Sequence, residues 1–593
     1  MSLAKSGNHT RAWVPVHQQI VTTHQIADGD YPTMRKFFYI SALVLVLQVQ
    51  DESFAALDRL SDFALLDNDG RFHQLSRYQH KRALVIMAYG SECDSMAQAY
   101  SQFQAVQAKF KGLEIEFLLI DPFDLGRSAI SSLQLDIPIL EDGGQLVSET
   151  LGIAHTGEVL VLNPRRSTLY YQGAADAGLE SALDGVLAGS LTDTVRSDSL
   201  GCPINFPMAD IHKESPPDYA TEVVPIIQEK CAGCHKQGGV GPFAMDSHIM
   251  MMGWSPMIRE VLLNKRMPPT QVDSYIGHSD DARYLSKREL QTLVHWIDAG
   301  APAGEFQSDP LELPAEETEG WLLGEPDFIA RTPEQEVPAT GVLDYRYVSI
   351  DLPFEEDKWI SAIQYRAGDA SVLHHLMTFV TAPGEDFWGE ERSQTSTSRR
   401  FIEGYSPGTE NLSVFNEGTG VLIPKGHRLS MQLHYVTNGQ STTDETELGL
   451  YFSDSSELKE KRVQAVSTRF EIPANTAEFP QRASHEFEEA VVITGIRARM
   501  NYRGKRMEFL VETPAGEQSK IFSVPAYNYG WQPHYVLDEP IYLSAGSRVI
   551  VDGAFDNSVS NPTNPNPDAA VGFGMESWEE MFAGYFTYHI AEP

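Results

Sequence analysis

The five residues Cys231-Ala232-Gly233-Cys234-His235 constrain this chain more than any other feature. Two cysteines one helical turn apart can add to the two vinyl groups of a haem, and the adjacent histidine is then positioned to ligate the iron. The same cysteine spacing is also half of a zinc site. No second cysteine pair follows, and His235 adjoins the motif directly, so the pattern favours a covalently attached c-type haem over zinc.

An iron bound through His235 needs a second axial ligand to carry single electrons in a low-spin state. We predict Met267, because a thioether raises the reduction potential and the surrounding sequence Lys265-Arg266-Met267-Pro268-Pro269 resembles that of cytochrome c domains. Six other residues compete for the role of second iron ligand: Met245, Met250, Met251, Met252, Met257 and His248. Most of these six are better explained as soft packing around a porphyrin.

Helical patterning surrounds the motif across residues 201–305. Ser286 and Glu289 form the pattern of a capping box, and apolar residues at positions 290, 293, 294 and 297 then fall on one helix face. Gly300 and Pro302 end that helix. A second helix over 220–230 leads into the cysteines and is expected to pack near the first. These features predict an all-α cytochrome c domain.

The length of the chain indicates how many domains it forms, and its net charge limits its partners. The chain has 593 residues, too many for one hydrophobic core, so several domains are expected. Its formal net charge of −37 argues against nucleic acid or an anionic membrane surface as a partner, because both would repel it. An acidic surface suits docking to an external redox partner that is basic.

A secretion signal is predicted within residues 1–50, an N-terminal extension and signal segment. Met34-Arg35-Lys36 precedes an apolar stretch over residues 37–47, which is shorter than the roughly 20 residues of a membrane span. Ser53-Phe54-Ala55 is a candidate cleavage site, and a retained N-terminal anchor is the alternative. We therefore expect a periplasmic or otherwise exported protein with no other integral membrane part.

Residues 51–200 alternate between buried strands and helices. Strands are expected over 83–88 and 113–120, a helix over 96–110, and a hairpin from 159–162 and 169–171. This pattern resembles the thioredoxin-like fold of the peroxiredoxin and redoxin families. Cys93 lies at the strand-to-helix turn where those families place their nucleophilic cysteine, and a helix N-terminus lowers the pKa of a thiol.

Two positions depart from that resemblance. Met96 stands where a Cys-x-x-Cys motif has its second cysteine, and Thr156-Gly157 stands where the family usually has Thr-Pro. We therefore do not expect disulfide exchange, and a peroxide-reducing activity centred on Cys93 is the weaker of the functional hypotheses. Cys93 and Cys202 are either paired in a structural disulfide or two separate thiols, and the sequence leaves both open.

After an acidic linker, residues 325–460 and 461–593 have the short strands and turn residues of two all-β sandwiches. His374 and His375 are adjacent in one expected strand, and His434 lies in a later one. Adjacent strand residues point to opposite faces, so the pair can serve one metal only through a twist or bulge. Otherwise one histidine is exposed and the other buried.

The motifs around these histidines carry a second resemblance. In order they are Tyr405-Ser-Pro-Gly408, Ile423-Pro-Lys-Gly426, Leu448-Gly-Leu450, Arg503-Gly504-Lys505, Tyr529-Gly-Trp-Gln532, Phe555-Asp-Asn-Ser558, Asn561-Pro-Thr-Asn-Pro-Asn-Pro567 and Trp578-Glu-Glu-Met581. The set resembles the type II, ascorbate-dependent copper monooxygenases, which include peptidylglycine α-hydroxylating monooxygenase and dopamine β-monooxygenase. The resemblance implies two jelly-roll-type sandwiches with one copper site each.

The first site implied by the resemblance is an electron-transfer copper held by His374, His375 and His434, and neutral imidazoles suit copper in both oxidation states. The second activates O2 and uses a His-x-His pair with a methionine. Here the pair is replaced by Arg499 and Asn501, and only the methionine is kept, as Met581. Arginine does not bind copper and its charge repels the ion, so we expect this site to be lost or rebuilt.

Two functions follow. One is a periplasmic copper-dependent monooxygenase acting on a small molecule and O2, with the fused haem supplying electrons. The alternative is a non-catalytic haem and copper electron-transfer or copper-binding protein. The expected architecture is multidomain: a thioredoxin-like α/β domain, an all-α cytochrome c domain and two all-β jelly-roll-type sandwiches. The substrate and the catalytic residues stay unknown.

Overall fold

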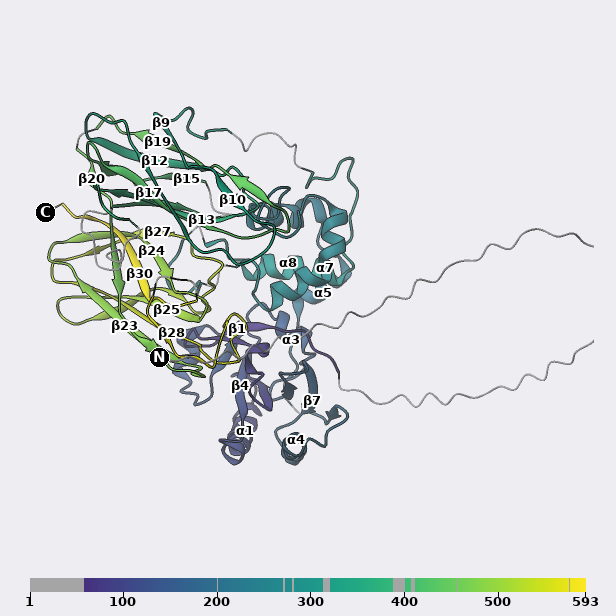
Figure 1. The fold of residues 1–593 in the computed structure, drawn as a ribbon. Helices are drawn as coiled ribbons and strands as arrows, with labels where there is room; N and C mark the ends of the chain where they lie inside the picture. Colours follow the sequence, from purple (N-terminus) through teal and green to yellow (C-terminus); the bar gives the residue numbers. More distant parts are fainter. Residues whose placement is uncertain are drawn as a thin grey trace, which may run out of the picture. The chain divides into compact units, whose positions relative to one another are not determined.

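A computed structural model (Figure 1) describes residues 58–199, 201–269, 272–279, 282–312, 320–387, 400–406, 411–455, 457–574, 576 and 578–592. The expected secretion signal beginning at Met34 lies outside these residues. Within the described part of the chain, no helix is both long and apolar enough to cross a membrane.

The first part of the chain is a thioredoxin-like α/β fold built on one mixed sheet. Its strands run in the order β5-β4-β3-β6-β7-β8. Strands β3 to β5 are parallel, and β6 and β7 are the antiparallel hairpin that the sequence predicts. The strands are β3 (Ala83–Ala88), β4 (Ile115–Asp121), β5 (Ile139–Glu141), β6 (Val159–Asn163), β7 (Thr168–Gly173) and β8 (Val195–Arg196), with β1 (Ala64–Leu66) and β2 (Phe72–Gln74) in a separate ribbon.

Both faces of this sheet are buried, which explains why β3 is apolar throughout. Val85 and Met87 belong to one core cluster, whereas Leu84 and Ile86 belong to another. The helices are α1 (Met96–Phe110), α2 (Arg127–Ser132), α3 (Leu146–Thr150) and α4 (Ala177–Ala188), with the 3-10 turn η1 (Leu75–Tyr78).

A helical segment follows, and its described residues from 204 to 312 contain no strand. Its helices are α5 (Pro207–Glu214), the π-helical turn η2 (Tyr219–Val223), α6 (Val224–Lys230), α7 (His248–Leu263) and α8 (Lys287–Asp298). The predicted capping box is present: Ser286 Oγ accepts from the Glu289 amide at 3.2 Å, and the Ser286 amide donates to Glu289 Oε2 at 2.7 Å. Helix α8 contacts η2, and Trp296 is fully buried between them.

The first sandwich has a sheet in the order β11-β17-β13-β14 and a second that contains β20-β16-β12-β19-β9, packed around one core. Its strands are β9 (Phe328–Arg331), β10 (Gln335–Val337), β11 (Arg346–Asp351), β12 (Lys358–Arg366), β13 (Leu373–Thr381), β14 (Arg400–Tyr405), β15 (Leu412–Val414), β16 (Thr419–Ile423), β17 (Arg428–Tyr435), β18 (Thr442–Asp444), β19 (Glu447–Phe452) and β20 (Lys459–Glu460).

The second sandwich pairs the sheets β21-β30-β24-β27 and β23-β28-β25-β26 around a separate core. Its strands are β21 (Arg462–Ser467), β22 (Glu471–Ile472), β23 (Phe479–Glu486), β24 (Val491–Arg499), β25 (Gly504–Glu512), β26 (Gln518–Val524), β27 (Tyr535–Leu543), β28 (Arg548–Phe555), β29 (Val571–Gly572) and β30 (Ala583–Ile590). Strand β24 alternates its buried side chains between this core and residues of the first sandwich, which brings Arg499 beside strands β13 and β17.

Candidate functional site

Three histidines converge in the first sandwich on the neighbouring strands β13 and β17. His375 lies directly opposite His434 in the antiparallel ladder, and the register shifts between Leu373 and His375. His374 is therefore the extra residue of a β-bulge, which turns its side chain toward the other two. The bulge that the adjacent histidines require is present.

The three imidazoles meet through their Nδ1 atoms. Nδ1 of His374 lies 3.1 Å from Nδ1 of His375 and 3.4 Å from Nδ1 of His434. One ligand nitrogen from each ring lies within 4.8 Å of the others. Among the described residues, this is the only such gathering of three histidine, cysteine or carboxylate ligands.

Burial keeps these rings neutral, which is the form that binds metals. Burial and then the neighbouring His434 and His374 hold the pKa of His375 well below its usual value, and Nε2 of His375 is buried without a hydrogen-bond partner. Burial, His374 and Arg499 lower the pKa of His434 to about 3. Burial also lowers the pKa of His374, partly opposed by a hydrogen bond with the Gly530 backbone. The three residues fit a copper ion.

Tyrosines that the sequence analysis did not connect with the site surround it. The ring of Tyr345 lies 5.1 Å from that of His434 and 5.7 Å from that of His375, centroid to centroid. Its hydroxyl is 3.0 Å from that of Tyr529, which belongs to the second sandwich. Tyr345 precedes strand β11 without any local motif, so no pattern in the sequence marks it.

The second position implied by the copper monooxygenase resemblance is filled by a guanidinium group. Arg499 Nε donates to Met581 Sδ at 3.0 Å, Nη1 to Met377 Sδ at 3.5 Å, and Nη2 to Gln432 Oε1 at 3.4 Å. Met377 and Gln432 lie opposite each other on strands β13 and β17, two positions beyond His375 and His434 and on the same face of the sheet. Arg499 therefore contacts the ladder beside the histidines.

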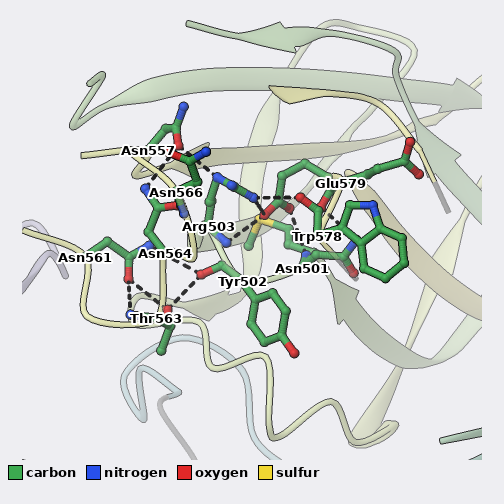
Figure 2. Close-up of polar contacts among 12 residues, drawn as sticks. Asn501, Tyr502, Arg503, Asn557, Asn561, Thr563, Asn564, Asn566, Trp578 and Glu579 are labelled. Atoms are coloured by element: carbon green, nitrogen blue, oxygen red, sulfur yellow. Dashed lines mark hydrogen bonds and ion pairs between the residues drawn. The ribbon is translucent and has the colours of Figure 1, made fainter. Parts of the chain in front are cut away.

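These surroundings do not fit a copper ion at the second position. The Met581 sulfur that was expected to ligate metal instead accepts a hydrogen bond from a buried cation. Asn501 is buried as well, and its side-chain amide donates to the carbonyl groups of Glu576 and Glu579 (Figure 2). Arg499 is therefore committed to other contacts, whereas Asn501 uses only its side-chain nitrogen and leaves Oδ1 buried without a hydrogen-bond partner.

The asparagine-rich motif of the second sandwich has a structural role (Figure 2). Arg503 is 2% exposed, donates from Nε to Asn557 Oδ1 at 2.8 Å, and donates from Nη1 to the Trp578 carbonyl at 3.0 Å. Asn564 donates to the same Asn557 oxygen at 3.0 Å, and the Thr563 hydroxyl donates to the Tyr502 carbonyl. These contacts hold the loops that follow β24 and β28.

The cysteine-histidine motif follows the end of α6. The amide of His235 donates to the Cys231 carbonyl, and the Nδ1 atom of His235 lies 3.0 Å from the Phe243 carbonyl. That carbonyl fixes Nδ1 as the protonated nitrogen and leaves Nε2 available to an iron. Burial lowers the pKa of His235, so the ring is neutral. The residues fit a covalently attached haem.

The structure does not bring Met267 into contact with this motif. Met267 is 39% exposed and lines a cavity of about 620 Å³, whose lining contains none of Cys231, Cys234 and His235. The competitor His248 is engaged elsewhere, because its Nε2 lies 2.8 Å from the Ala301 carbonyl. The sixth-ligand role of Met267 stays a prediction.

Of the two alternatives for the remaining cysteines, the structure contains the disulfide. Cys93 and Cys202 are bonded, with Cα atoms 5.8 Å apart and a sequence separation of 109. Cys93 precedes α1 at the expected turn and is 8% exposed, whereas Cys202 is exposed.

No protein-family model matches the sequence, and no curated protein matches it. Among solved structures, a hypothetical protein from Sinorhizobium meliloti 1021 is 22% identical over 25% of this chain and 93% of its own length, with a TM-score of 0.23. Peroxidoxin BcpB from Mycobacterium tuberculosis is 18% identical over 23% of this chain and 95% of its own length, with a TM-score of 0.19.

Proposed function

We propose that this protein is an exported oxidoreductase that binds one copper ion through His374, His375 and His434 and exchanges single electrons with a c-type haem on its own chain. The observation that carries the proposal is that a bulge in β13 brings the half-buried His374 and the buried His375 together with the buried His434 of β17, all three with lowered pKa values. The Nδ1 atoms of His375 and His434 both lie within 3.4 Å of Nδ1 of His374, and a metal ion bound by all three rings would account for this convergence.

The two cofactors would be held by different parts of the chain. Cys231 and Cys234 would attach the haem, His235 Nε2 and Met267 would ligate its iron, and the three histidines would hold the copper. When bound, both metals supply one-electron redox chemistry. The chain contributes neutral imidazoles, the Phe243 carbonyl that orients His235, and the tyrosines that cover the histidines.

Arg499 favours the electron-transfer alternative over a two-copper monooxygenase. Its guanidinium takes up the Met581 sulfur and places a positive charge where the oxygen-activating metal would be. Oxygen chemistry would then need the three-histidine copper itself. Uptake of O2 that depends on copper and reduced haem would support the monooxygenase, and its absence supports the carrier.

Metal analysis tests the proposal. The haem-loaded chain dialysed against copper is expected to bind one copper per haem. His434→Ala should abolish that copper and leave the haem spectrum unchanged, because the haem ligands lie in another part of the chain. His485→Ala, which removes a histidine of the second sandwich outside the site, serves as the matched control. Stoichiometric copper in the His434 variant would refute the ligand assignment.

A further inference from the structure

A cavity of about 620 Å³ lies between the thioredoxin-like part and the helical segment, with Pro525 of the second sandwich in its wall. Small-molecule sites in proteins have volumes of about 300–1,000 Å³ and occur preferentially where domains adjoin. The described residues of the wall include neither the Cys231–His235 motif nor the three histidines of the candidate copper site. The cavity is therefore a candidate binding site that neither proposed cofactor explains.

Most of the cavity wall is apolar. Leucines reach it from three elements, for example Leu66 of β1, Leu262 of α7 and Leu290 of α8. Met267 and Tyr275 also line the cavity, and they are 39% and 49% exposed. A ligand with a hydrocarbon part would cover apolar surface that is open to water, and burial of such surface favours binding.

The described wall also contains two carboxylates, and both are engaged in other contacts. Glu141 accepts from Nε and Nη2 of Arg127, each at 2.9 Å. Asp142 accepts from the Val147 amide at 3.3 Å and from the Ser148 amide and hydroxyl at 2.7 and 2.6 Å. Burial raises the pKa of Asp142 to about 7, so at neutral pH this group is only partly ionised. Neither carboxylate is placed to bind a cationic ligand.

Three basic side chains belong to the same wall, those of Lys265, Lys287 and Arg288. Lys287 forms an ion pair with Asp124 and is exposed. Arg288 is exposed as well, whereas Lys265 is half-buried. Since one of the two carboxylates is neutralised by an arginine and the other is only partly ionised, positive charge exceeds negative charge along the described wall. The wall therefore favours an anionic group over a cationic one.

We propose that this cavity binds an amphipathic carboxylate, with its hydrocarbon part on the leucines and its head group beside Lys265. The ammonium group of Lys265 can donate charge-assisted hydrogen bonds to the carboxylate, and the hydrocarbon part displaces water from the apolar wall. Because Met267 lines the cavity, the ligand would contact the residue that we predict to ligate the haem iron. Binding requires neither metal, so this inference is independent of the proposed function.

Calorimetric titration of the haem-loaded full chain with octanoate tests the proposal. We expect one site per chain and a dissociation constant roughly tenfold or more below that of 1-octanol, because a hydrogen bond to a charged group contributes about that much affinity. Absence of saturable octanoate binding, or equal affinities for the acid and the alcohol, would refute the proposal. Binding confined to the haem-free variant Cys231→Ser, Cys234→Ser would show that the haem itself fills the cavity, which would also overturn it.

Two variants locate the ligand within the cavity. Gly144 lines the wall, and a Cβ atom there would meet only Lys287 Cβ, at 3.9 Å, so the side chain of Gly144→Leu enters open space. We expect it to weaken octanoate binding by about tenfold or more. Gly253→Leu is the matched control, because this exposed glycine of α7 is not part of the wall and nothing lies within 4 Å of its Cβ position. Equal octanoate affinities of the two variants would refute the site.

Lys265→Met tests the place of the head group, because it removes the charge and keeps an unbranched apolar side chain. Octanoate affinity should fall by about tenfold or more, while octanol affinity stays unchanged. An octanoate affinity equal to that of the wild type would overturn the assignment of Lys265. This variant and the comparison of acid with alcohol decide the matter if Gly144→Leu does not fold.

Discussion

Glu403 is the carboxylate that a buried lysine, a buried arginine and a histidine share where the two sandwiches meet, and replacing it should weaken their contact. Lys461 Nζ donates to Glu403 Oε2 at 2.8 Å, while Arg497 Nη2 and His534 Nδ1 each lie 3.6 Å from its oxygens. Burial alone would raise the pKa of Glu403, but Lys461, His534 and Arg497 outweigh it and lower the pKa from 4.5 to about 2.

The size of the effect follows from that pKa. At about 1.4 kcal/mol per pKa unit, the fall from 4.5 to about 2 corresponds to about 3 kcal/mol of stability at neutral pH. Removal of one partner of a buried ion pair typically costs a comparable amount of stability, about 3–5 kcal/mol. Glu403→Gln should therefore destabilise the sandwich pair by about 3 kcal/mol at pH 7. Because the folded-state pKa is depressed, the contribution is complete above pH 4.5 and is lost as pH falls toward 2.

Hydrogen exchange under increasing urea measures the loss of stability at individual strands. A local measurement is needed because a chain of several domains does not unfold in one step. The amides of strands β14 and β24 report on the cluster. Glu457→Gln changes an exposed carboxylate of the same region and should leave the urea midpoint unchanged. If β14 and β24 exchange at pH 7 in Glu403→Gln as they do in this control, the contacts of Glu403 contribute nothing to the association of the two sandwiches.

Three further predictions concern the helix cap, the second metal position and the haem. Ser286→Ala should destabilise α8 by about 1 kcal/mol, because its hydroxyl caps the Glu289 amide, and a calorimetric scan that matches the wild type would contradict this. Arg499→His combined with Asn501→His should raise bound copper from one to two ions per chain in metal analysis, and a stoichiometry of one would show that the site has lost more than its ligands. Met267→Ala should lower the haem reduction potential in a redox titration, since thioether ligation raises it, and an unchanged potential would point to another sixth ligand.

The parts of the fold with local signals were predictable from sequence. Strand β3 and helix α1 have the predicted bounds, because a run of apolar residues and a helical pattern are properties of neighbouring positions. The capping box at Ser286 was confirmed for the same reason. Helix α7 was not predicted: its methionines suggested packing around a porphyrin, although Met251 is core and Met252 is exposed.

Contacts between residues far apart in the chain were harder to predict from the sequence. The histidine pair at 374 and 375 implied a bulge, and the resemblance implied His434 as the third ligand, but the register that sets His375 opposite His434 depends on the whole sheet. The sequence left the state of Cys93 and Cys202 undecided because they lie 109 positions apart. It also gave no reason to examine Gly201, whose need to be glycine comes from a carbonyl 45 residues earlier in the chain.

Arg499 shows how one substitution changes two sites at once. Met377 follows His375 by two residues and Gln432 precedes His434 by two, so each pair shares a face of its strand, and the guanidinium contacts the rung beside the histidines. It therefore fills the second metal position and also lowers the pKa of His434 by its charge. A positive charge so near the three histidines disfavours a divalent ion more than a monovalent one, because the repulsion scales with the charge of the metal. A copper ion held by the three histidines, as we propose, would thus be biased toward its reduced state, as suits an acceptor of single electrons.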